Sequence, residues 1–376
     1  MCNHTGKECA DNILAVLERS NRVYQIGLAY FPSSDFEKFW TAMQELFPEL
    51  RYVALLSEKT VAVIPDSFLG GSAPRLRIFH ITGIAFPALP KLLLSTTHLV
   101  TLRLVDIPHS GYLSPEAMVA ALSTLNSLTQ LWLEFQSPRS RPERRLPPPT
   151  RFVHPALASL RFKGASEYLE DLVARIDAPE LFNLHITFFN QIIFDTLQFI
   201  QFISRTPTLE ALEEARVSFE DGTARVNFSS RTSRLEDFEV KIPCNELDWQ
   251  VSSLEQVFTS CLPHLSTLEG LSIDSPGGWL PDWQDNIENT LWLELLLPFT
   301  SVKNLYLSEK FARRIVPALQ ELVEGRRIEV LPALENIFLE GLESSGPVEK
   351  CIEPFVAMRQ VTGHPVAVTH WDRSSP

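Results

Sequence analysis

Arginine, tryptophan and histidine side chains recur along this chain at positions where they could bind another molecule. Arg103, Trp132 and Arg161 follow one another at intervals of 29 residues. Guanidinium groups recognise carboxylates and phosphates by paired hydrogen bonds, and both tryptophan and arginine are enriched among the residues that dominate interface energies. This composition favours a binding surface. The competing interpretation is that these are ordinary solvated side chains of a repeat protein.

Sequence strings that carry a catalytic geometry are absent. No GxGxxG, GxxxxGKS/T, GxSxG or HExxH string occurs, so the usual nucleotide, phosphate-loop, serine-hydrolase and zinc-protease sites have no basis here. His80 and His185 lie several repeats apart, too far for one metal or one proton relay. We therefore expect a noncatalytic protein without a cofactor or a bound metal. The enzymatic alternative is a GTPase-activating repeat protein that acts through one exposed arginine.

The elements that must position these side chains follow one repeated phrase, LxxLxL, in which Val, Ile or Phe also occurs. "HLVTLRLVDI" (98–107) and "NSLTQLWLEF" (126–135) show it clearly. Copies begin at Val23, Leu50, Leu76, Leu99, Leu128, Leu157, Leu181, Leu235, Leu268, Val302 and Leu334, with a weaker one at Leu212. Their spacing of 23 to 34 residues brackets the leucine-rich-repeat period of roughly 20 to 29 residues.

Each copy predicts a short strand, and the segments between copies have helical periodicity. The alternation in LxL is typical of a strand with one buried face. Ser34 with Glu37 reads as a capping box, and Ser114 with Pro115 as a helix start. We expect helical segments at 33–47, 114–125, 166–176 and 309–325, with Phe36, Trp40, Met43 and Phe47, then Leu169, Leu172 and Ile176, then Phe311, Ile315, Leu319 and Leu322 on their buried faces.

These patterns predict an α/β fold, an irregular leucine-rich-repeat solenoid or horseshoe. A parallel β-sheet would form the concave face, with helices and loops on the convex face. The alternative is a doubly wound α/β domain. We expect an N-terminal tail and capping helix at 1–20, then a leucine-rich-repeat domain of about 11 to 13 repeats at 21–376, with a Pro/Arg-rich loop at 136–155.

The same register predicts which side chains face a partner. If the fourth and sixth template positions point inward, the positions beside them point outward onto the concave face. The predicted partner-binding residues are His80, Arg103, Trp132, Arg161, Lys163, His185, Arg216, Tyr306 and Phe338.

Composition restricts the classes of partner. A net charge of -13 with 45% hydrophobic residues is typical of a folded protein and argues against nonspecific binding to nucleic acid or to an anionic membrane. The 5 cysteines are scattered, and no CxxC pair or apolar leader occurs, so we expect a cytoplasmic or nuclear protein. A protein substrate of unknown identity is the expected partner.

Several longer strings resemble a large fungal family of F-box proteins with degenerate leucine-rich repeats. They include "PDSFLGGSAPRLR" (65–77), "IPHSGYLSPEAMV" (107–119), "FKGASEYLEDLVARIDAP" (162–179) and "LELLLPFTSVKNLYLSEKFARRIVPALQELVEGR" (293–326). The resemblance covers nearly the whole chain from about residue 11.

The resemblance implies the substrate receptor of a cullin-type ubiquitin ligase. In that family an N-terminal F-box binds the Skp-type adaptor and the repeats present the substrate. Only "DNILAVLERS" precedes the first repeat, so we expect the F-box to be missing and carry over no adaptor-binding residue. Adaptor and cullin ligase would be partners only if an F-box lies upstream. The alternative is an adaptor-free scaffold or decoy.

Overall fold

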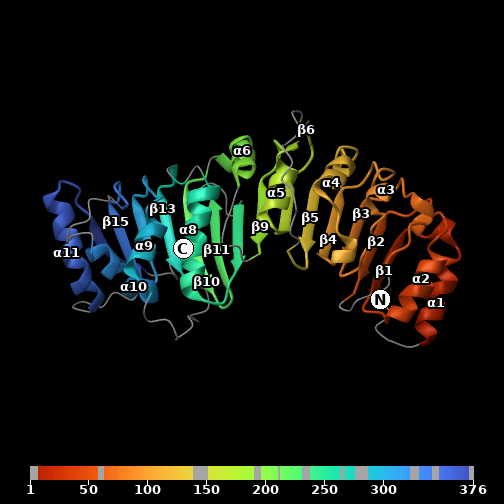
Figure 1. Ribbon diagram of the computed structural model, residues 1–376, viewed down its shortest axis with the longest axis horizontal. Helices are drawn as coiled ribbons and strands as arrows, with labels where there is room; N and C mark the ends of the chain where they lie inside the picture. Colours follow the sequence, from red (N-terminus) through yellow and green to blue (C-terminus); the bar gives the residue numbers. More distant parts are fainter. Residues whose placement is uncertain are drawn as a thin grey trace. The chain divides into compact units, whose positions relative to one another are not determined.

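The computed structural model describes residues 7–57, 63–138, 151–189, 196–210, 212–230, 238–262, 265, 267–275, 287–321, 330–340 and 347–371. The chain divides into two compact units, Met1–Leu184 (unit 1) and His185–Pro376 (unit 2). Each unit is a mixed α/β structure with a large, mostly parallel sheet and helices (Figure 1).

Unit 1 contains a parallel sheet whose strands are neighbours in chain order. Its strands are β1 (Gln25–Ala29), β2 (Tyr52–Leu56), β3 (Ile78–Thr82), β4 (Thr101–Ile107), β5 (Gln130–Phe135) and β7 (Ser159–Gly164). The fourth template position stays in register across them, so that Val53 pairs with Phe79 and Leu102 with Leu131. These side chains are fully buried. The repeated phrase therefore sets both the strands and their alignment.

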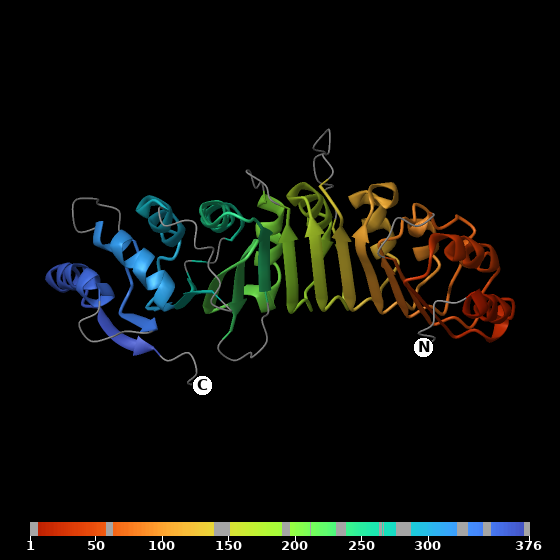
Figure 2. The same ribbon diagram turned by 90° about the horizontal axis from the view of Figure 1, so that it is seen from below.

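Helices cover one face of the unit 1 strands. They are α1 (Lys7–Leu17), α2 (Ser33–Ala42), α3 (Leu89–Leu93), α4 (Pro115–Leu122) and α5 (Ser166–Val173), with short 3-10 turns η1 (Ser20–Arg22), η2 (Phe68–Gly71) and η3 (His109–Gly111). Figure 2 shows the orange and yellow helices of unit 1 on one side of its strands. Within the described residues, α3, α4 and α5 all lie on this one side of the strands. We call the opposite strand face, which these three helices do not cover, the open face.

The two predicted helix starts had different outcomes. The Ser114 hydroxyl accepts a hydrogen bond from the Ala117 amide at 3.2 Å, which confirms the cap of α4. The capping box at Ser34 was wrong, because α2 begins at Ser33 and its cap residue, Pro32, has no side-chain acceptor. Phe36 and Trp40 are buried on α2 as predicted, but the helix ends at Ala42 rather than at residue 47, so Met43 and Phe47 are buried beyond its end.

A small second sheet lies in unit 1. Strands β6 (Phe152–Val153) and β8 (Ile176–Asp177) pair in parallel. Ile176 was predicted on a helix; α5 ends at Val173, and Ile176 is buried as a strand residue instead. Most of the predicted 136–155 loop, residues 139–150, lies outside the described residues, and its end at 152–153 is strand β6.

Unit 2 departs from the expected all-parallel sheet. Its strand order is β12 (Phe238–Pro243), β11 (Thr223–Ser229), β10 (Glu214–Glu220), β13 (Gly270–Asp274), β14 (Asn304–Leu307), β15 (Asn336–Glu340) and β16 (Ala367–Trp371). β11 runs antiparallel to both β10 and β12. Asp221 and Gly222 form the tight turn before β11, and Gly222 has a φ of +73°, a backbone conformation that favours glycine.

The remaining elements complete unit 2. β9 (Asn183–Phe188) contains the boundary between the units. The helices are α6 (Leu197–Ser204), α7 (Pro207–Glu210), α8 (Leu247–Cys261), α9 (Asn289–Leu296), α10 (Glu309–Glu321) and α11 (Pro347–Val361). Phe311, Ile315 and Leu319 of α10 are buried as predicted, whereas Leu322 lies outside the described residues.

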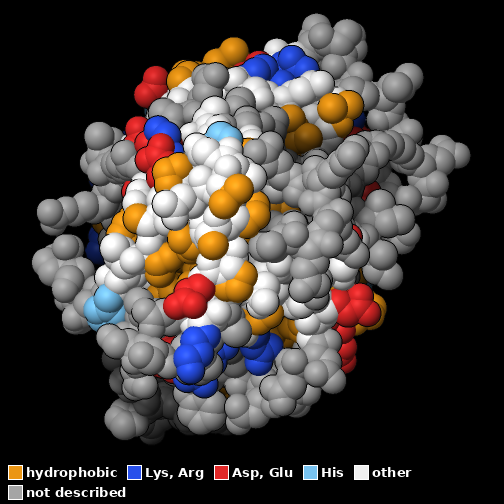
Figure 3. All heavy atoms as spheres, turned by 90° about the vertical axis from the view of Figure 1, so that its left-hand side faces the viewer, with side chains coloured by type: hydrophobic (Ala, Val, Ile, Leu, Met, Phe, Trp, Pro, Cys, Tyr) orange, Lys and Arg blue, Asp and Glu red, His pale blue; other side chains and the backbone are white. Residues whose placement is uncertain are grey.

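The end of unit 2 that carries α11 exposes apolar surface. Figure 3 looks onto this end and shows hydrophobic side chains gathered over its middle, with lysine and arginine side chains below them. Val361, the last residue of α11, is 88% exposed. Strand β16, which carries no copy of the template, lies beyond β15 in the strand order. The last strand and helix thus leave apolar groups in contact with solvent.

Candidate functional site

The predicted binding residues of unit 1 come together on the open strand face. His80, Arg103, Trp132 and Arg161 occupy matched register positions on β3, β4, β5 and β7. Neighbouring strands of a sheet lie about 4.8 Å apart, so these side chains form a continuous row. Their neighbours at the fourth and sixth template positions point to the opposite, helix-covered side.

An indole held between two guanidinium groups is the centre of this row. The Cζ atom of Arg103 lies 4.0 Å from the ring centroid of Trp132, and that of Arg161 lies 4.7 Å from it. Both distances are within the range of a cation–π attraction, and the strand that carries Trp132 separates the strands that carry the two arginines. We call Arg103, Trp132 and Arg161 the cation–indole stack.

Polar neighbours hold the two arginines in place. Arg103 Nη2 donates to Gln130 Oε1 at 3.3 Å, and Arg161 Nε lies 3.8 Å from Glu134 Oε1. The Arg103 Nε atom is buried and has no hydrogen-bond partner among the described residues. The surrounding residues therefore accept hydrogen bonds from only some of the N–H groups of the stack.

His80 and Lys163 lie at the two sides of the stack. Burial, together with the positive charge of Arg103, lowers the pKa of His80, whose Nε2 lies 3.0 Å from Thr82 Oγ1. Lys163 Nζ is 3.6 Å from a carboxylate oxygen of Asp106. Asp106 has a φ of +50° at the irregularity in β4 that shifts the register before Ile107.

Exposure of the unit 1 residues is smaller than an outward-facing row predicts. His80, Arg103, Trp132, Arg161 and Lys163 are all partly buried. The two arginines pack against Trp132, whereas His80 and Lys163 contact Thr82 and Asp106.

Unit 2 brings its predicted residues to charge pairs instead. His185 Nδ1 lies 2.7 Å from Glu239 Oε2, and Arg216 Nη2 lies 2.7 Å from Asp274 Oδ2. Burial raises the pKa of Glu239, but hydrogen bonds and charge from His185 and Lys241 outweigh it and lower the pKa to about 2. Arg225 Nε is a further cation, 3.3 Å from Glu239 Oε1.

Sequence reasoning did not identify either carboxylate as a site residue. Glu239 and Asp274 are buried on their strands, although periodicity places both on the polar side. One sequence feature points to Glu239: it is an acid at the fifth template position, where several other copies have arginine or histidine. A sequence pattern cannot show that the side chains of His185, Arg225 and Lys241 converge on Glu239.

Tyr306 and Phe338 pair as aromatic side chains. Their rings are stacked with centroids 4.5 Å apart and an interplanar angle of 9°, and they occupy matched positions on β14 and β15. The Trp371 ring packs edge-on against Tyr306 at 5.4 Å. The four predicted residues of unit 2 thus divide between two charge pairs and one aromatic cluster.

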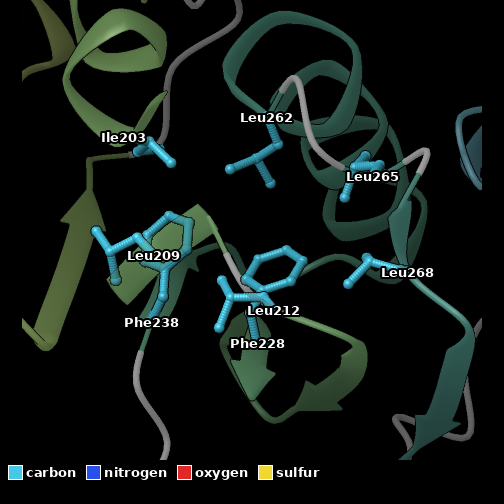
Figure 4. A pocket seen from close by; sticks show the side chains of 8 residues that line it. All are labelled: Ile203, Leu209, Leu212, Phe228, Phe238, Leu262, Leu265 and Leu268. Atoms are coloured by element: carbon cyan, nitrogen blue, oxygen red, sulfur yellow. The ribbon is translucent and has the colours of Figure 1, made fainter. Parts of the chain in front are cut away.

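An apolar cavity in unit 2 is too small for a ligand. Figure 4 shows its lining by Ile203, Leu209, Leu212, Phe228, Phe238, Leu262, Leu265 and Leu268. Its volume is about 20 Å³, whereas ligand pockets measure about 300 to 1,000 Å³. It is a packing defect next to the antiparallel strands.

Two searches of the described residues gave negative results. Among them, no helix combines the length and apolar character that crossing a bilayer requires. Within the same residues, no cluster of three or more His, Cys, Asp or Glu side chains has the arrangement to hold a metal ion.

The chain has a distant structural similarity to a solved protein. No protein-family model and no curated protein matches this chain. Among solved structures, the chain is similar to the leucine-rich repeat-containing protein LegL7 from Legionella pneumophila, with a TM-score of 0.35 and 12% identity over 94% of this chain and 95% of that one.

Proposed function

We propose that this chain is an irregular leucine-rich-repeat solenoid that binds a protein partner without catalysing a reaction. The cation–indole stack on the open face of unit 1 is the observation that supports this function most directly. Two arginines hold like charges beside one partly buried indole, so an anion bound there would relieve their mutual repulsion. The same composition is typical of interface hot spots.

The geometry favours an acidic segment as the bound part of the partner. The faces of the Arg103 and Arg161 guanidinium groups lie against Trp132, so their N–H edges are the groups left for hydrogen bonds. Carboxylates accept from such edges in pairs. Arg103 Nε is buried and has no acceptor among the described residues, so the surroundings of this guanidinium leave part of its hydrogen-bonding capacity unused.

Within this function, we propose the substrate-recognition part of an F-box-type ubiquitin ligase receptor. Its support is the resemblance of the repeat strings to the fungal family. An adaptor-free scaffold or decoy would use the same binding face, so the two assignments differ only in contact with the Skp-type adaptor. Pull-down of this chain and of an upstream-extended gene product with that adaptor separates them.

The test of partner binding compares three immobilised full-length proteins in a fungal extract. These are the unaltered chain, the Trp132→Ala/Arg161→Ala variant and Trp249→Ala, which removes an indole that is 48% exposed on α8. Bound proteins are quantified by mass spectrometry. We expect a specific set of proteins to be lost at least tenfold from the double variant and retained by Trp249→Ala. Equal capture by all three proteins would exclude the stack as the binding site.

A further inference from the structure

The N-terminal edge of the unit 1 sheet carries a row of arginines that the cation–indole stack does not use. The first template leucine of each copy is fully buried, as at Leu50 and Leu76. Arg51, Arg75 and Arg77, which lie next to these two leucines in the sequence, are exposed. In the second and third copies the residue after the leucine is Arg51 and Arg77, and Arg75 precedes Leu76.

Backbone hydrogen bonds hold these arginines in neighbouring layers. The amides of Arg77 and Ile78 both donate to the Arg51 carbonyl, at 2.9 and 3.1 Å. The amides of Val100 and Thr101 likewise donate to the Arg77 carbonyl, at 2.8 and 3.0 Å. The Cα positions of Arg51 and Arg77 are therefore separated by about one strand spacing of 4.8 Å, and this spacing does not depend on their side chains.

Arg51, Arg75 and Arg77 border a cavity of ligand size. Its volume is about 380 Å³, and it is lined by Arg51, Arg75, Arg77, His98, Val100 and Ser127. This volume falls within the range of small-molecule sites, about 300 to 1,000 Å³. All six residues are described residues of unit 1, and all lie in the turns that precede β2 to β5. The cavity is thus a separate place from the stack, which sits on the strands themselves.

Positive charge at this cavity is left uncompensated by the described residues. Arg75 forms an ion pair with Glu49. Arg51 and Arg77 form no ion pair with any described residue, although the whole chain has a net charge of -13. Two adjacent, exposed guanidinium groups repel each other, and a folded acidic protein gains nothing from placing them together unless an anion lies between them.

We propose that this arginine cavity binds a phosphomonoester dianion. Two unpaired guanidinium groups call for a ligand group with close to two negative charges, which a phosphomonoester carries at neutral pH. A single carboxylate or a phosphodiester would balance only one of them. The guanidinium fork also matches phosphate oxygens in geometry, and the Ser127 hydroxyl and the His98 ring add hydrogen-bonding groups at the rim.

Titration calorimetry on the full-length protein in phosphate-free buffer tests this site. The probes are glycerol 2-phosphate, a neutral peptide with one phosphoserine, its unphosphorylated form, and a single-stranded oligonucleotide. The proteins are the unaltered chain, Arg51→Gln/Arg77→Gln, and the control Lys303→Gln. Lys303 occupies the equivalent position before β14, where its amide donates to the Glu269 carbonyl. Thermal unfolding of all three proteins verifies folding.

We expect one or both phosphomonoester probes to bind, with at least tenfold weakening in Arg51→Gln/Arg77→Gln and no change in Lys303→Gln. Phosphopeptide binding that is much tighter than that of glycerol 2-phosphate identifies a phosphorylated protein side chain as the source of the group. Similar affinities identify a small soluble phosphomonoester. Three outcomes overturn the proposal: no binding of either probe, equal weakening in the control, or tighter binding of the unphosphorylated peptide or the oligonucleotide. None of these outcomes depends on the cation–indole stack.

Discussion

Where the residue before a strand is charged, it is arginine in unit 1 and mostly glutamate in unit 2. In unit 1 this position holds Arg51 and Arg77, and in unit 2 it holds Glu213, Glu269 and Glu335, with one lysine among them. The backbone contacts are the same, since the Glu269 carbonyl accepts from the amides of the next copy at 2.9 and 3.0 Å. The comparison shows that the fold needs the backbone at this position and leaves the side chain free to serve binding.

The strand faces of the two units differ in a related way. In unit 1, Arg103 and Arg161 lie against an uncharged indole, and Arg161 Nε is 3.8 Å from Glu134 Oε1. In unit 2, Arg216 pairs with the buried carboxylate of Asp274, and Arg225 and Lys241 share that of Glu239, at 2.7 to 3.3 Å. The cations of unit 2 therefore have closer anionic partners than the two arginines of the stack.

The largest expected effect breaks the internal pairing of unit 2. Glu239→Gln should lower the free energy of unfolding by about 3 kcal/mol at pH 7, because it leaves several cations around a neutral group. Urea unfolding measures this loss. The matched control is Glu335→Gln, an exposed residue of the same unit, for which we expect a change within about 0.5 kcal/mol.

The same variant has a defined pH dependence. The pKa of Glu239 is lowered to about 2, so its contribution to stability is complete above the ordinary glutamate pKa of about 4.3 and is lost as the pH falls toward 2. The deficit of Glu239→Gln should shrink over that interval. A deficit that stays constant from pH 7 to pH 3 would show that the lost stability is not electrostatic.

The second effect removes the centre of the stack in unit 1. Trp132→Ala should cost about 2 kcal/mol, roughly half of what a fully buried tryptophan costs, because the indole is only partly buried. Trp249→Ala, from an exposed position on α8, should cost less. Thermal or urea unfolding of the two variants makes the comparison, and equal losses would argue that the two arginines add nothing to the packing of Trp132.

The third effect compares the aromatic pair of unit 2 with the cation–indole stack. Double-mutant cycles should give coupling energies of about 1 kcal/mol for both Tyr306 with Phe338 and Arg103 with Trp132. The two cycles should differ in their response to salt. Raising NaCl from 0.1 to 1 M should weaken only the second coupling, because only that pair carries a charge that salt can screen. Equal responses would contradict an electrostatic part in the stack.

The smallest expected effect concerns the charged residues that precede the strands. Lys303→Gln should cost about 0.5 kcal/mol, since it breaks the exposed pair with Glu269 at 2.7 Å. Arg51→Gln should leave stability unchanged or raise it slightly, because the charged groups that share its cavity are Arg75 and Arg77. Unfolding midpoints at low ionic strength show the difference, and a clear loss in Arg51→Gln would reveal an attraction that the described residues do not provide.

Sequence periodicity predicted the strands because burial imposes it. In all twelve copies of the template, the fourth and sixth positions lie on a strand and are buried, including the weak copy at Ala215 and Val217. The antiparallel strand β11 was missed although its turn, Asp221 and Gly222, is a hairpin signal. Its inward residues Ala224, Val226 and Phe228 alternate without the template leucines, so the search for one phrase passed over them.

The sequence by itself determined the repeated strand, its buried face and the side of each strand on which the polar residues lie, because a period of two leaves one arrangement that buries the leucines. Only the tertiary structure decided how those polar residues meet. The stack around Trp132, the carboxylate of Glu239 and the cavity beside Arg51 each join residues from different strands, and distances between strands are set by packing and register, which no single stretch of sequence contains.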